Sequence, residues 1–141
     1  MLKGIPPIIS PELIKVLMEM GHGDEIILAD GNFPAASHSS RLINGYGHGV
    51  SAFLTAILEL FPLDTYVPYP VMLMDTVEGD EKNPVIWKEY EEIVNKMSDF
   101  PVQIEKLERM DFYERSKAAY AIVATSERLA YANLILKKGV V

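Results

Sequence analysis

Residues 21–30 read GHGDEIILAD and join a predicted helix to a predicted strand, the two kinds of element that build the fold. The apolar run in this stretch predicts a strand over residues 25–29 that is buried on both faces. Upstream, residues 10–12 (Ser-Pro-Glu) are typical of a helix start, because serine caps, proline fits the first turn and glutamate complements the helix dipole. Gly21 is a natural helix end. One face of this helix carries the apolar residues Leu13, Val16, Leu17 and Met20.

The same alternation of helices and apolar strands continues along the chain. Apolar runs predict strands at residues 41–43, 71–74, 102–107, 121–125 and 133–137, and helical spacing predicts helices at 50–60, 83–97 and 111–119. Residues 33–40 are expected to form a loop, Ser51 to cap the second helix, and Asp111 to begin the fourth with a capping box. Because such strands need cover on both faces, we predict one three-layer α/β/α domain over residues 1–141, with a mostly parallel or mixed sheet of about six strands.

Composition narrows the class of protein. The chain has 141 residues, of which 49% are hydrophobic, and 13 basic against 20 acidic residues give a net charge of -7. An acidic chain without a Lys/Arg cluster repels phosphate backbones and anionic lipid, so neither nucleic acid nor a membrane is an expected partner. The absence of cysteine excludes disulfides and thiol catalysis. No signal peptide or membrane-spanning run is recognisable, so a cytoplasmic location is expected, and the high apolar content indicates a homo-oligomer.

His22 and Asp30 are the first candidates for chemistry. A histidine between two glycines is accessible to a small ligand, and the ordinary pKa of histidine suits proton transfer near neutrality. Asp30 follows a strand, and sheets of this class bind ligands beyond their strand ends. One interpretation is a general acid/base pair at one edge of the sheet. The other is structural, with His22 capping a helix C-terminus and Asp30 forming an Asx turn.

Two further groups carry side chains that suit sugar hydroxyls. The first comprises Arg109, Tyr113, Arg115 and Tyr120, and the second is Tyr131 with Asn133. Considered locally, surface ion pairs, packing and turn chemistry explain both groups better. The glycine-rich stretch 45–49 lacks the spacing and the lysine of a phosphate loop, and the three histidines fit no metal motif. We therefore expect neither a nucleotide nor a metal.

Several motifs, in this order, resemble those of a known family. They are Gly21-His22-Gly23-Asp24, Asp30 followed by Phe33-Pro34, Glu78-Gly79-Asp80, Phe112-Tyr113-Glu114-Arg115, Tyr131-Ala132-Asn133 and Lys138-Gly139-Val140. Together they resemble the family shared by fucose mutarotases and D-ribose pyranases, and the resemblance covers essentially the whole chain. Ribose members of the family tend to carry a histidine where Arg109 stands, so the resemblance favours the fucose group.

The resemblance implies a cofactor-free isomerase that interconverts the α and β anomers of L-fucose. It also implies a ring-shaped assembly, often a decamer, with sites between adjacent subunits. His22 matches the catalytic acid/base, and the substrate-binding positions match Asp30, Arg109, Tyr120, Tyr131 and Asn133. The alternatives are D-ribose pyranase activity, a non-catalytic sugar-binding transport accessory and, in a third class, a metal-dependent hydrolase.

Overall fold

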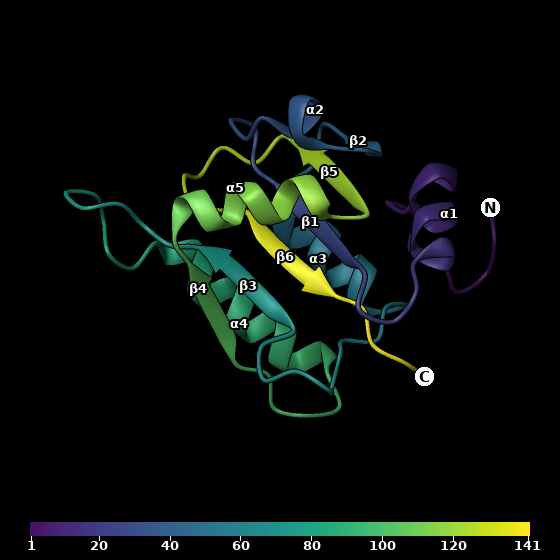
Figure 1. Ribbon diagram of the computed structural model, residues 1–141. Helices are drawn as coiled ribbons and strands as arrows, with labels where there is room; N and C mark the ends of the chain where they lie inside the picture. Colours follow the sequence, from purple (N-terminus) through teal and green to yellow (C-terminus); the bar gives the residue numbers. More distant parts are fainter.

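One six-stranded mixed sheet runs through the computed structural model, which describes residues 1–141 (Figure 1). Its strand order is β2-β5-β1-β6-β3-β4. Strand β6 runs antiparallel to its neighbours β1 and β3, and the other pairs are parallel. The prediction of a mixed sheet with about six strands is therefore confirmed. The strands are β1 (Glu25–Ala29), β2 (Leu42–Gly45), β3 (Val71–Met74), β4 (Ile104–Leu107), β5 (Ala121–Thr125) and β6 (Leu134–Lys137).

Helices cover both faces of this sheet, as the three-layer prediction requires. Helices α1 (Pro11–Glu19), α3 (Val50–Leu58) and α4 (Val85–Met97) pack on one face. Helices α2 (Ala35–His38) and α5 (Arg109–Ala118) pack on the other, and α5 crosses in front of the sheet in Figure 1. None of the helices has the length and hydropathy to cross a bilayer.

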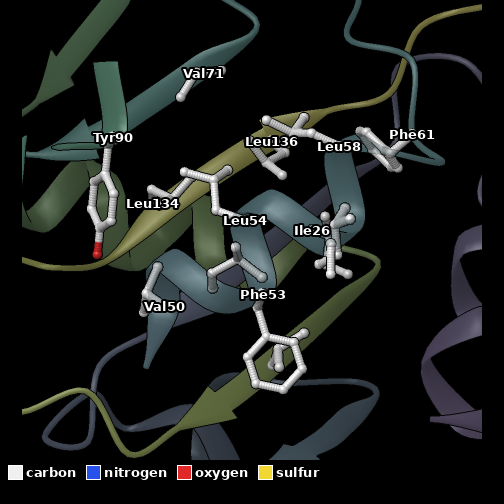
Figure 2. Packing of buried hydrophobic residues seen from close by; sticks show 14 of the residues in the cluster. Ile26, Val50, Phe53, Leu54, Leu58, Phe61, Val71, Tyr90, Leu134 and Leu136 are labelled. Atoms are coloured by element: carbon white, nitrogen blue, oxygen red, sulfur yellow. The ribbon is translucent and has the colours of Figure 1, made fainter. Parts of the chain in front are cut away.

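Two apolar clusters hold the layers together. Along β1, Ile26 and Leu28 join a cluster of 28 buried residues, whereas Ile27 and Ala29 join a cluster of 11 on the opposite face. Figure 2 shows the larger cluster, in which Leu54 of α3 lies among side chains from the sheet. Successive side chains of a strand point to opposite faces, so a strand between two helical layers is apolar throughout. This explains the unbroken apolar run after residue 25.

The expected loop at residues 33–40 contains a short helix instead. Helix α2 spans Ala35–His38, and the Ser39 N–H bonds to the Ala35 carbonyl at 3.0 Å. Phe33 and Ala35 are buried against α5 in the smaller cluster. Packing, which local composition does not reveal, therefore stabilises this turn.

Both expected side-chain caps are wrong. Gly49 occupies the N-cap of α3, the Val50 N–H donates to Glu127 Oε2 at 3.3 Å, and Ser51 Oγ is buried without a partner. Helix α5 begins at Arg109, and Glu108 caps it by accepting from the N–H groups of the next turn. In the first case a distant residue supplies the cap, and in the second the helix simply starts two residues before Asp111.

Candidate functional site

Asp30 and Asn133 form a reciprocal pair at the carboxyl end of β1. The Asp30 N–H donates to Asn133 Oδ1 at 2.7 Å, and Asn133 Nδ2 donates to Asp30 Oδ2 at 2.9 Å. The antiparallel pairing of β1 with β6 brings these two residues together across 103 positions of sequence. Burial raises the pKa of Asp30, and hydrogen bonds from Asn32, Phe33, Ala132 and Asn133 offset only part of that effect. The Asn32 N–H donates to Asp30 Oδ1 at 2.9 Å, which is the expected Asx turn.

Tyr131 adds a phenol at the same edge of the sheet. Its hydroxyl donates to the Asp80 carboxylate and accepts from the Val77 N–H at 3.3 Å. Its backbone lies in the left-handed region with φ 57°, which is uncommon for an aromatic residue. The Trp87 indole N–H donates to the Tyr131 carbonyl at 2.8 Å. The bond to Asp80 raises the pKa of the Tyr131 phenol, and the nearby positive charge of Arg109 opposes that shift.

Arg109 completes this group from the start of α5. The helix follows β4, whose carboxyl end lies at the same edge as that of β1, because β3 and β4 run parallel to β1 and only β6 is reversed. The Arg109 side chain is exposed, and its guanidinium carbon lies 5.5 Å from the centre of the Tyr113 ring. We call the four side chains gathered here the carboxyl-edge group: Asp30, Arg109, Tyr131 and Asn133.

His22 lies at the opposite end of the sheet. It occupies the turn between α1 and β1, before the strand begins. The five residues of β1 span about 16 Å, and Asp30 follows the far end of the strand. The expected acid/base pair of His22 and Asp30 at one edge is therefore wrong for a single chain. One residue precedes the buried strand and the other follows it, so the two necessarily lie at opposite strand ends of the sheet.

The partner of His22 within the chain is Asp64, which sequence reasoning missed. His22 Nε2 lies 3.0 Å from Asp64 Oδ1, and the His22 ring packs at 5.1 Å from the ring of Tyr66. The His22 side chain is 44% exposed, whereas that of Asp64 is 2% exposed. Asp64 lies in the connection between α3 and β3, and no local pattern in the sequence marks it. It comes close to His22 only because this connection and the turn of His22 both lie beside the end of β6.

The structural interpretation of His22 as a helix cap is also wrong, because Lys138 performs that function. Lys138 Nζ donates to the carbonyls of Leu17 and Met20 at 2.9 and 2.5 Å. The cation thus satisfies the carbonyls at the end of α1, where it also complements the helix dipole. The imidazole of His22 remains available for other contacts.

Tyr120 lies at the amino end of β5, away from the carboxyl-edge group. Its N–H donates to the Glu25 carbonyl at 2.8 Å, and its hydroxyl donates to Glu19 Oε2 at 3.0 Å. The guanidinium carbon of Arg41 lies 4.0 Å above its ring. Tyr120 is therefore at the same end of the sheet as His22.

The other polar residues of this region have structural partners. Arg115 forms an ion pair with Glu25 at 2.8 Å, so the ion-pair interpretation is correct for Arg115, with a partner from β1. Tyr113 stacks on Phe33 with ring centres 5.6 Å apart, and His38 contacts Tyr113 edge-on. No group of three or more His, Asp or Glu side chains converges as the ligands of a metal ion would.

Comparison with known proteins relates the whole chain to one family. Residues 3–141 match the RbsD / FucU transport protein family. The L-fucose mutarotase of Actinobacillus pleuropneumoniae serotype 5b (strain L20) is 48% identical over 140 residues, which are 99% of this chain and 97% of that protein. The L-fucose mutarotase of Haemophilus influenzae (strain 86-028NP) is 47% identical with the same coverage.

Solved structures give the same result. The fucose mutarotase of Streptococcus pneumoniae, crystallised in complex with L-fucose, is 53% identical, with a TM-score of 0.95 over 99% of both chains. FucU from Bifidobacterium longum is 50% identical, with the same TM-score and coverage. RbsD of Bacillus subtilis complexed with D-ribose is 23% identical, with a TM-score of 0.76 over 100% of this chain and 99% of that one. At that identity, the similarity to RbsD shows a shared fold alone.

Proposed function

The chain belongs to the RbsD / FucU transport protein family, and we propose that it is an isomerase that interconverts the α and β anomers of L-fucose. The observation that carries this proposal is the full-length similarity to a fucose mutarotase solved with L-fucose, at 53% identity and a TM-score of 0.95. The curated relatives named L-fucose mutarotase support it at 47–48% identity over 99% of the chain.

The chemistry of this reaction needs one group that both accepts and donates a proton. Anomers exchange when the sugar ring opens to the aldehyde, the bond next to C1 rotates, and the ring closes on the other face. An imidazole can serve both directions of such a reversible step. We assign that role to His22. Sugars open slowly without a catalyst, so the acceleration of ~10²–10⁴-fold that acid/base catalysis supplies is sufficient.

We assign substrate binding to the carboxyl-edge group, and Tyr120 stays a predicted binding residue at the other end of the sheet. Sugar hydroxyls both donate and accept, and the group offers both kinds of partner: the carboxyl of Asp30, the amide of Asn133, the phenol of Tyr131 and the guanidinium of Arg109. The guanidinium is exposed and therefore accessible to a ligand. Substitution of Arg109 by alanine is expected to weaken L-fucose binding.

We further propose that the site is shared between two copies of the chain in a homo-oligomer, a ring such as the decamer. The separation of His22 from the carboxyl-edge group by the length of β1 supports this arrangement. A groove beside His22 also carries exposed apolar side chains, with Leu2 76% and Met18 77% exposed, and Val140 lines the same groove. Exposed apolar patches of this kind mark association surfaces, and a second copy is the occupant that brings a carboxyl-edge group to His22.

Mixing two inactive variants tests the shared site. His22→Ala should lose anomer exchange, measured by saturation-transfer NMR, and Arg109→Ala should lose it at L-fucose concentrations below the wild-type KM. In co-assembled 1:1 mixtures, about a quarter of the sites in a ring of head-to-tail contacts join an intact His22 to an intact Arg109. We therefore expect activity above that of either variant alone.

The result that would contradict a shared site is a mixture with no more activity than the mean of its components. The function itself has a separate test, which compares wild-type exchange rates on L-fucose and D-ribose. Faster exchange of D-ribose pyranose and furanose forms would support the pyranase alternative. Sugar binding without any acceleration would support the transport accessory. Full anomer exchange in His22→Ala would remove His22 from the mechanism.

A further inference from the structure

A turn in the connection after β3 places Asp80 beside the phenol of Tyr131. We propose that Asp80 is a positioning residue of the sugar site, which takes the hydroxyl hydrogen of Tyr131 so that the phenol meets the sugar only as a hydrogen-bond acceptor. This inference rests on the proposed function, because it takes Tyr131 as a substrate-binding residue. It adds the residue that orients the phenol and the kind of sugar group that the phenol recognises, which is a hydroxyl that donates.

Hydrogen-bond accounting at the phenol oxygen determines the direction of its O–H. The Tyr131 hydroxyl contacts the carboxylate of Asp80 and the backbone N–H of Val77, the latter at 3.3 Å. A carboxylate has no hydrogen to give and a backbone N–H only donates, so the phenol donates to Asp80 and accepts from Val77. Its one hydrogen is therefore used within the chain, and only the lone pairs of the oxygen are left for a ligand. Because the bond to Asp80 raises the pKa of the phenol, the hydrogen also stays in place at neutral pH.

The turn that carries Asp80 holds this carboxylate in one place. The Asp80 N–H donates to the Val77 carbonyl at 3.2 Å, which closes a turn of four residues. Gly79 has φ 93°, the left-handed conformation that glycine supplies at the third position of such a turn. Val77 and Asp80 thus approach the phenol from the two ends of one turn, although they lie 54 and 51 positions away from Tyr131 in the sequence.

Helix α4 holds the main chain at the other end of Tyr131. The Trp87 indole N–H donates to the Tyr131 carbonyl at 2.8 Å. The hydroxyl of the fully buried Tyr90 donates to the next carbonyl, that of Ala132, also at 2.8 Å. With its main chain bonded to α4 and its phenol bonded to the turn, Tyr131 is oriented before a ligand arrives, and such preorganisation lowers the entropic cost of binding.

The carboxylate of Asp80 has no other partner in the chain. It accepts one hydrogen bond, from Tyr131, and takes part in none of the ion pairs. Tyr131 and Asp80 line a groove of about 360 Å³, so a ligand can reach the phenol while Asp80 holds its hydrogen. Glu78 is exposed in the same turn and its carboxylate contacts no donor, which makes it the matched control.

The ionisation of Tyr131 tests the contact in solution. The chain has seven tyrosines, so ¹³C labelling of the ring carbon that bears the hydroxyl gives few NMR signals, and Tyr131→Phe identifies that of Tyr131. At a pH near the ordinary tyrosine value of about 10, a larger fraction of Tyr131 should be ionised in Asp80→Ala than in the wild type, because the bond to the carboxylate is lost. Glu78→Ala removes an equal charge from the turn and should change this fraction less. Equal ionisation in Asp80→Ala and the wild type would overturn the proposal, whether or not the protein acts on L-fucose.

A double-mutant cycle tests whether Asp80 acts on the sugar through Tyr131. Tyr131→Phe deletes the hydroxyl and Asp80→Ala deletes its acceptor, and each should weaken L-fucose binding, measured by NMR titration, about three- to tenfold, the size of one hydrogen bond. In the Tyr131→Phe background, Asp80→Ala should weaken binding no further, because the group through which it acts is already gone. A second loss of the same size would mean that Asp80 contacts the sugar itself or supports the site in another way, and the proposal would be overturned.

The conservative variant and the control complete the experiment. The asparagine oxygen in Asp80→Asn still accepts from the phenol, so this variant and Glu78→Ala should both keep the affinity within about twofold of the wild-type value. Because the phenol gives no proton to the sugar, Asp80→Ala should raise KM and leave kcat within about twofold. A loss in Glu78→Ala as large as that in Asp80→Ala would reject the positioning role. If the wild type neither binds L-fucose nor accelerates its anomer exchange, the proposed function is what fails, whereas an additive cycle in an active wild type rejects only the role of Asp80.

Discussion

Two buried carboxylates, Asp30 and Asp64, lie near opposite ends of the sheet in contrasting surroundings. Asp30 receives hydrogen bonds from amide groups alone, and burial raises its pKa. Asp64 faces an imidazole and the charge of Lys137, and these interactions, with the Tyr66 N–H, lower its pKa in spite of burial. A carboxyl group with a raised pKa can switch between donor and acceptor toward a hydroxyl, whereas one with a lowered pKa stays an acceptor. The environment of Asp30 suits its proposed contact with sugar hydroxyls.

The lowered pKa of Asp64 predicts how stability depends on pH. Below the model-compound value of 3.8, the unfolded chain binds the proton before the folded protein does. The contribution of the ionised Asp64 is therefore fully present above that value and is lost as the pH falls through the lower folded pKa. The difference in free energy of unfolding between the wild type and Asp64→Asn should thus shrink on acidification from about pH 5 to about pH 2.

Urea unfolding at a series of pH values, at one fixed protein concentration, measures this difference. Asp99→Asn, which removes one charge from an exposed position, is measured alongside as the control. A difference for Asp64→Asn that grows on acidification would mean that the carboxylate is not stabilised by its neighbours.

The segment after β6 connects several of the elements around His22. Lys138 caps α1 with its side chain, and its backbone pairs with residues on both sides, in an isolated bridge to Leu63 and in hydrogen bonds with Gly23 and Asp24. Three elements far apart in sequence therefore meet at one strand extension. This explains why the position of His22 depends on the far C-terminal end of the chain.

Gly139→Ala tests the importance of that segment. A Cβ at residue 139 would lie 2.5 Å from the Leu63 carbonyl oxygen and 2.8 Å from Asp64 Cα, and these backbone atoms cannot move aside independently. We expect the variant to lose about 1–3 kcal/mol of stability, the usual cost of overpacking. Anomer exchange should fall as well, because the segment that is bonded to the turn of His22 is displaced.

Gly21→Ala provides the comparison for stability in chemical denaturation. A Cβ there would meet only Asp24 Oδ2, at an ordinary 3.7 Å, so the free energy of unfolding should change by no more than about 1 kcal/mol, the cost or gain typical of an unstrained glycine substitution. If Gly139→Ala were as stable and as active as the wild type, the close approach of residue 139 to Leu63 and Asp64 would be refuted.

In the whole molecule, the sheet separates the two halves of the proposed site. The carboxyl-edge group lies where β1 and β4 end and β6 begins, and the connection after β3 extends outward beyond that edge (Figure 1). His22 lies at the other end, and the chain termini lie on the same side as α1 (Figure 1). In the proposed shared site, a single copy contributes one half to each of two sites, as in a ring with head-to-tail contacts.

Met18→Asp is expected to break the assembly without unfolding the subunit. The Met18 side chain is 77% exposed on α1, so a charge there is tolerated in a lone copy but would be desolvated in a contact between copies. We expect a smaller particle by light scattering, a far-UV circular dichroism spectrum like that of the wild type, and loss of anomer exchange. Met18→Leu keeps the apolar surface and should retain both size and activity. A Met18→Asp protein of wild-type size and activity would exclude this surface as the contact.

Local sequence was sufficient for most features that depend on neighbouring residues, although it missed helix α2 and the Glu108 cap of α5. Helix α1 with its Ser10 cap, the strands, the three layers and the Asx turn at Asp30 follow from apolar spacing and from short-range hydrogen bonds. The reversed direction of β6, the pairing of Asp30 with Asn133, the contact of His22 with Asp64 and the cap that Glu127 provides for α3 depend instead on the tertiary structure. These contacts join residues that are tens of positions apart, and no local propensity encodes which distant partner satisfies a buried polar group.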